Sequence, residues 1–196
     1  MIDPQSAIIT IVISFFGAFF AFVFQRIFGR EQRRQELTQK FIDELLGPHF
    51  FPHVVTVSKV RREYLESEEP KVFIQNVAAG YWFPGAKPYY IGATTNGLTD
   101  HEHIELAIRF SSRLCDAIKS NMLNNKRIKD TIADDFHWTH NFLREIAEEV
   151  KRQRAIAEEK GSQTEAKWVN DINFLGDFFG YRYSLSAEKL SIKDFR

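Results

Sequence analysis

The sequence predicts an all-α protein: one N-terminal transmembrane helix followed by a helical-bundle cytoplasmic domain with a long aromatic loop. Three observations lead to this prediction. A strongly apolar run lies near the start of the 196-residue chain, apolar residues then recur three or four positions apart, and one glycine-, proline- and aromatic-rich stretch breaks that period. The predicted parts are an anchor over residues 1–28, a juxtamembrane helix or stalk over 29–47, and a helical domain over 48–196.

The predicted membrane segment carries no charged side chain from Pro4 to Gln25. A helix of that length extends about 33 Å, close to the roughly 30 Å hydrocarbon core of a bilayer. A cleaved signal peptide is disfavoured because no Lys or Arg precedes the run and no small-residue cleavage site follows it. A buried core helix seldom stays uncharged for so long, so we expect a retained anchor.

The orientation of this segment follows from the charges beside it. Arg26, Arg30, Arg33 and Arg34 follow the apolar run, and no basic residue precedes it. The positive-inside rule then predicts a single-pass protein of the inner (plasma) membrane, with its N-terminus outside and its C-terminal domain cytoplasmic. The same arginines are candidates for binding lipid headgroups of the bilayer, although setting the topology explains them equally well.

Small residues also mark one side of the predicted span. Ser14 and Ala18 are four residues apart, as are Gly17 and Ala21. Such pairs let two helices approach closely, and they predict a homo-oligomer that forms through this face.

Beyond the membrane segment, local signals divide the chain into helices. A stripe of Leu37, Phe41 and Leu45 predicts a first helix that ends at Gly47-Pro48, and Pro52 can begin the next. A short amphipathic helix is expected around Phe73.

The second half of the domain has clearer signals. Thr99 and Glu102 form a capping box that predicts a helix start, and the stretch 121–125 predicts a break. A long, charged helix is expected from there to Gly161, and a last one around Trp168.

The stretch 80–98 has no helical period and is predicted to be a loop. Its aromatic residues Trp82, Phe83, Tyr89 and Tyr90 would expose much apolar area in water. Either they fold back onto the helices, or they form a loop that binds the membrane surface or a partner.

No catalytic site and no cofactor is predicted, because no known catalytic or nucleotide-binding motif is present. Among the six histidines, His137 and His140 share a helix face, and with His103 they are the best candidates for a metal site; a buried, hydrogen-bonded histidine explains them better. The single cysteine, Cys115, is expected in the core. The zero net charge disfavours nucleic acid as a partner.

The order of parts resembles a family of uncharacterised bacterial single-pass membrane proteins. The likeness rests on the uncharged span, the arginine-rich junction, the capped helix containing Glu102-His103-Ile104-Glu105, and the long charged helix after it. It implies a bacterial inner-membrane location and an all-helical cytoplasmic domain, and it implies no catalytic residue.

Three functions follow as hypotheses. The first is a membrane-anchored helical interaction or assembly module, with a possible protein partner at the cytoplasmic face. The second is a membrane-acting effector or sensor of stress or phage response that oligomerises through its span. The third is a small His-dependent hydrolase or metalloprotein.

Overall fold

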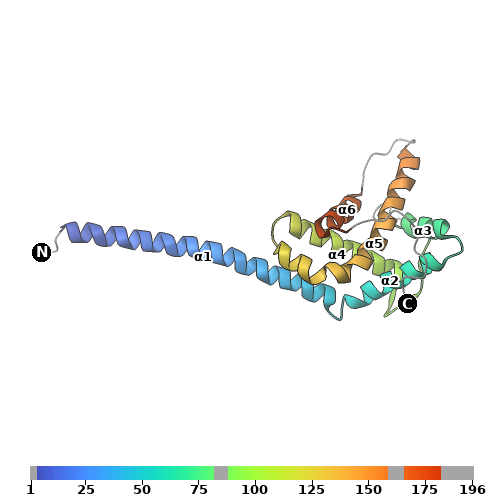
Figure 1. Ribbon diagram of the computed structural model, residues 1–196, viewed down its shortest axis with the longest axis horizontal. Helices are drawn as coiled ribbons and strands as arrows, with labels where there is room; N and C mark the ends of the chain where they lie inside the picture. The colour runs from blue at the N-terminus through green and yellow to red at the C-terminus, as the bar shows by residue number, and fades with distance from the viewer. Residues whose placement is uncertain (1–3, 82–87, 159–165, 182–196) are drawn as a thin grey trace.

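The computed structural model describes residues 4–81, 88–158 and 166–181, with side chains described from Ala18 on in the first helix and up to Ile156 in the fifth. Figure 1 shows one long helix that projects from a cluster of shorter ones. The elements are, in chain order, α1 (Pro4–Leu46), α2 (Phe51–Glu66), α3 (Pro70–Ala79), β1 (Thr94–Thr95), β2 (Leu98–Thr99), α4 (Asp100–Lys119), α5 (Asn125–Glu158) and α6 (Lys167–Phe179). The prediction of a mostly helical chain is confirmed.

The predicted transmembrane helix needs correction. In the ranges just given, no helix is long and apolar enough to cross a membrane. The predicted span is therefore wrong for the part of the chain that the structure describes, as are the single-pass inner-membrane location and the orientation derived from it.

Helix α1 has two parts with different surroundings. Residues 18–33, called the arm below, extend away from the other helices, whereas residues 34–46, called the root, lie against them (Figure 1). Gly29 does not interrupt the helix, as the predicted continuation into a stalk requires. The whole of α1 is about 64 Å long at the usual helical rise. The remaining elements, α2 to α6 with the small hairpin, form the head.

The root is fixed to the head by apolar and polar contacts. Leu45 and Ile42 are buried in the core, and Thr38 is fully buried beside them. The Thr38 hydroxyl accepts a hydrogen bond of 2.8 Å from the backbone N–H of Asn124, just before α5 begins. One turn earlier, Arg34 Nη2 donates to the carbonyl of Leu123 at 2.9 Å. These bonds satisfy backbone groups that the α4–α5 turn would otherwise leave unpaired.

Helix α4 lies at the centre of the head and contacts both α2 and α6. Its start is fixed by the predicted capping box: the backbone N–H of Glu102 donates to Thr99 Oγ1 at 3.3 Å, and the N–H of Thr99 donates to Glu102 Oε2 at 2.7 Å. Its buried apolar residues recur at helical spacing: Ile104, Ala107, Ile108, Phe110, Leu114, Cys115, Ala117 and Ile118. The capped, amphipathic helix predicted here is confirmed.

Two turns use residues with left-handed backbone. Asn121 has φ of 53° in the break between α4 and α5, where a break was predicted. Asn96 and Gly97, with φ of 52° and 80°, join β1 to β2 in an antiparallel hairpin. Positive φ at both central residues is the mark of a type I′ turn, for which Asn-Gly is a preferred pair. The sequence prediction had only a loop here.

Helix α6 is attached to α4 through a buried carboxylate. Asp171 is 1% exposed and accepts hydrogen bonds from Cys115 Sγ at 3.3 Å and Lys119 Nζ at 3.2 Å. Burial by itself raises the pKa of this carboxyl, but these donors outweigh it and hold the pKa of Asp171 below its ordinary value. Cys115 is buried as predicted, and burial raises the pKa of its thiol to about 11.

The contact between root and head can be tested with two neighbouring leucines. Leu45 is 2% exposed and Leu46 is 46% exposed. We expect Leu45→Ala to lower the free energy of unfolding by about 2–5 kcal/mol, because it leaves a cavity in a close-packed core. Leu46→Ala, the matched control, should change it by about 0.5 kcal/mol or less. Urea denaturation measures both changes. A loss for Leu45→Ala as small as the loss for Leu46→Ala would show that the root is not part of the core.

Candidate functional site

The arm carries a dense set of exposed large apolar side chains. Six of them lie within ten residues, each 54–67% exposed: Phe19, Phe20, Phe22, Phe24, Ile27 and Phe28. Scattered exposed apolar residues are normal, but a contiguous apolar patch usually marks an interaction site. The arm is therefore the strongest candidate for a functional surface in the described chain.

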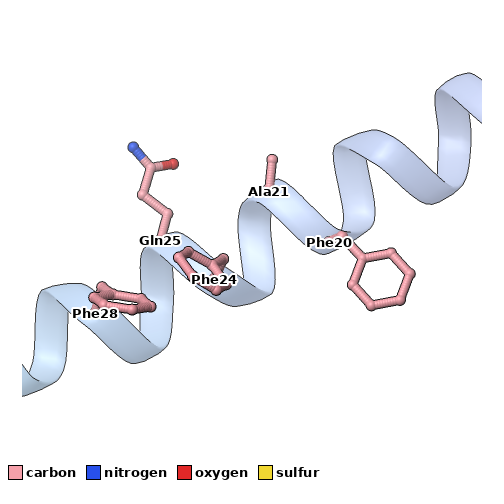
Figure 2. A pocket seen from close by; sticks show the side chains of 5 residues that line it. All are labelled: Phe20, Ala21, Phe24, Gln25 and Phe28. Carbon is pink, nitrogen blue, oxygen red and sulfur yellow. The ribbon is translucent and has the colours of Figure 1, made fainter.

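The side chains of the arm form a shallow hollow along one face. It is lined by Phe20, Ala21, Phe24, Gln25 and Phe28. Figure 2 shows Phe24 and Phe28 side by side, with Ala21 and Gln25 along the other edge. The rings of Phe24 and Phe28 are stacked, with centroids 4.2 Å apart. A row of large rings thus lies next to a row of smaller side chains.

The predicted packing residues and arginines fall on different parts of α1. Ala18 and Ala21 are exposed on the arm, whereas the exposure of Ser14 and Gly17 is outside what the structure describes. Arg26, Arg30 and Arg33 are exposed, and the Arg26 guanidinium lies 6.0 Å from the centre of the Phe22 ring.

Arg34, which was grouped with those arginines, belongs to the root and contacts the head. Besides the carbonyl of Leu123, its guanidinium reaches Asn121 Oδ1 at 3.3 Å. A role for Arg34 in holding the α4–α5 turn explains its position without lipid.

The predicted aromatic loop is divided in the structure. Trp82 and Phe83 lie outside the described residues. Tyr89 is 80% exposed, whereas Tyr90 packs on Phe73 with ring centroids 5.2 Å apart. The Tyr90 hydroxyl approaches Glu63 Oε2 at 3.1 Å and Asp100 Oδ2 at 3.3 Å. Burial, followed by the two nearby carboxylates, raises the pKa of Tyr90, so its hydroxyl stays protonated.

Asp100 organises the loop that precedes α4. Its side chain is fully buried. Its Oδ2 atom accepts a hydrogen bond of 2.8 Å from the backbone N–H of Ala93 and one of 3.4 Å from Lys59 Nζ. The backbone N–H of Asp100 in turn donates to the carbonyl of Ala93 at 2.9 Å. A carboxylate is favourable in the first turn of a helix because of the helix dipole. Asp100 therefore binds the loop to α4, while Lys59 of α2 balances its charge.

A pair of histidines joins α2 to the same region. His53 Nδ1 and His103 Nδ1 are 2.7 Å apart, and His103 Nε2 is 3.1 Å from the carbonyl of Thr95. A carbonyl oxygen can only accept a hydrogen bond, so a neutral His103 carries its proton on Nε2. Its Nδ1 then accepts a hydrogen bond from the N–H at His53 Nδ1. Burial, with a smaller contribution from His103, lowers the pKa of His53 and favours its neutral form.

The predicted metal candidates do not converge. His137 lies 3.0 Å from the Asn141 amide, and His140 is buried with Nε2 donating to the carbonyl of Ile172 at 2.8 Å. His103 is engaged with His53 instead. Within the described ranges, no group of three His, Cys, Asp or Glu side chains could hold a metal ion.

Sequence reasoning missed the pairing of His53 with His103 and the buried position of Asp100. Both depend on contacts between segments about 40 to 50 residues apart. A local signal existed only for the hairpin, in Asn96-Gly97.

Gly92 tests the contact between the loop and Asp100. It has φ of 71°, and a Cβ there would lie 2.4 Å from Asp100 Oδ2. Gly97 has φ of 80° but no atom within 4 Å of such a Cβ. Both Ala variants should lose about 1–2 kcal/mol from the left-handed backbone. Gly92→Ala should lose a further 1–3 kcal/mol or so by overpacking against Asp100, measured by urea denaturation. Equal losses would contradict the close contact.

His140 should make the stability of the fold depend on pH. Burial, despite the hydrogen bond to Ile172, lowers the pKa of His140 to about 4 from 6.5. Between these values the unfolded chain binds more protons than the folded one, so stability is full above pH 6.5 and falls as the pH drops toward 4. This group alone accounts for about 3 kcal/mol of that loss.

The contribution of His140 can be isolated with His140→Gln, which keeps a donor for the Ile172 carbonyl but does not titrate. We expect the variant to show a shallower fall in the free energy of unfolding than the wild type over this pH range. Parallel curves would show that His140 is not held neutral by the fold.

Comparison with family models, with curated proteins and with solved structures finds no match to this chain. The resemblance to uncharacterised single-pass proteins thus stays a prediction from the pattern of the sequence.

Proposed function

We propose that this protein is a helical interaction module in which the head positions the arm and the arm docks against a helix of another polypeptide chain. The observation that carries the proposal is the set of six exposed large apolar side chains between Phe19 and Phe28. Nothing in the described chain covers them. Phe20, Phe24, Ile27 and Phe28 lie within about 100° of one another around α1, and a helix-in-groove contact is a common way to bury such a face; Phe19 and Phe22 lie on the other side of the helix.

The attachment of the arm supports this role. The arm continues without a break into the root, whose residues Thr38, Ile42 and Leu45 are buried in the head. A helix held in this way is presented to a partner already ordered, so docking would not have to fold it. Binding then avoids much of the entropy loss that a flexible segment incurs.

The other hypotheses have less support. The effector hypothesis required a transmembrane span, which the described chain lacks. The hydrolase or metalloprotein hypothesis depends on histidines, and His53, His103 and His140 are engaged in contacts that hold the head together.

Site-specific photocrosslinking tests the proposal in cells. The full chain would carry p-benzoylphenylalanine in place of Phe24, and in a separate version in place of Tyr89, which is 80% exposed on the head. We expect irradiation to give protein adducts from position 24 and far fewer from position 89, because only the arm face is proposed to be covered. Adding Phe20→Glu should abolish the adducts at position 24.

Two results would contradict the proposal. One is the absence of a protein adduct at position 24, including labelling of lipid alone. The other is equal labelling at positions 24 and 89, which would indicate exposure without specific docking.

A further inference from the structure

We infer that the partner of the arm is a second copy of this chain, whose arm crosses the first through the face lined by Phe20, Ala21, Phe24, Gln25 and Phe28. This inference rests on the proposed function and identifies the partner. Three properties of the face support it: its shape, its area and its lack of charge.

The shape of the face is complementary to itself. Phe20, Phe24 and Phe28 are four residues apart and form a high ridge, while Ala21, Gln25 and Gly29 form a lower ridge beside it. When ridges of this i±4 type pack into each other's grooves, two helices cross at about −50°. Under a two-fold axis that passes through the low ridge at Gln25, the phenylalanine ridge of each copy packs into the groove beside the low ridge of the other, as a symmetric interface requires.

The area of the face is sufficient for a dimer. Phe20, Phe24 and Phe28 are 58–67% exposed, and a Phe buries roughly 150–250 Å² when fully covered. With Ala21 and Gln25 added, each copy offers on the order of 500 Å², hence about 1,000 Å² in total. That is about the minimum area expected of a specific protein–protein interface.

The charges of the arm allow two identical copies to meet. At about 100° per residue, Arg26, Arg30 and Arg33 lie roughly 150° or more around the helix from the centre of the face. They would point away from a partner arm, so like charges need not meet across the interface. The only polar side chain lining the face is Gln25, whose amide both donates and accepts and can pair with its own copy.

Cysteine crosslinking tests this inference with the full-length chain. The native Cys115 is fully buried, so a new cysteine on the arm is the accessible thiol. We expect Gln25→Cys to form a disulfide-linked dimer under mild oxidation, at least about tenfold faster than Arg26→Cys, because a disulfide needs Cβ atoms about 4 Å apart. Arg26 is the matched control, since it is the next residue, is exposed and lies on the opposite face.

A mixing experiment separates this inference from the proposed function. Two copies of the Gln25→Cys chain with different affinity tags should be recovered in one crosslinked species, and Phe20→Glu should remove it. If no mixed species forms while position 24 still crosslinks to a different protein, the second copy is excluded and the interaction module stands. If Arg26→Cys crosslinks as fast as Gln25→Cys, this face is not the interface. If neither the Gln25→Cys disulfide nor the photocrosslink at position 24 forms, the inference and the proposed function are overturned together.

Discussion

The burial of the root against the α4–α5 turn is the contact on which the rest of the molecule depends. Within α1, the same continuous helix passes from an exposed arm to buried residues such as Ile42 and Leu45. The Thr38 hydroxyl and the Arg34 guanidinium complete the contact by satisfying backbone groups at the turn. Without this contact, the arm would have no fixed direction relative to the head. Its exposed aromatic residues would then lie on a segment that moves independently of the head.

Buried carboxylates extend this fixed frame through the head. Asp100 connects α4 to the preceding loop and to Lys59 of α2, and Asp171 connects α6 to Cys115 and Lys119 of α4. Each charge is taken out of water, which is tolerable only because it is hydrogen-bonded and paired. Both networks converge on α4, whose buried face contacts the core. The head is therefore organised around this one helix.

Local chemistry explains which features could be predicted from the sequence. The Thr99 capping box, the end of α1 at Gly47-Pro48 and the break near Asn121 each depend on a few adjacent residues. The Asn96-Gly97 hairpin was equally local, but the absence of a helical period led to a loop prediction for the whole stretch. Here a turn signal with a known geometry was more informative than the missing period.

Features that depend on distant contacts could not be predicted in the same way. No residue adjacent to His53 in the sequence indicates that it will hydrogen-bond to His103, because the two side chains meet only when α2 packs against α4. The apolar beginning of the chain shows the opposite problem: a local run of apolar residues predicted a span, but no helix in the described part of the chain is long and apolar enough to cross a membrane. For the arm, the sequence identified apolar residues, but their exposure and attachment to the root came from the structure.

The continuity of α1 also determines how association of the arms would affect the heads. A helix turns about 100° and rises 1.5 Å per residue, so a partner bound at Phe24 is placed at a defined angle and distance from the root at Thr38. Gly29 lies between them, but it stays helical and introduces no hinge in the described structure. The crossing angle of two arms would thereby fix the relative orientation of two heads. Inserting one residue between arm and root would rotate each head by about 100° around the arm without changing any side chain of the interface.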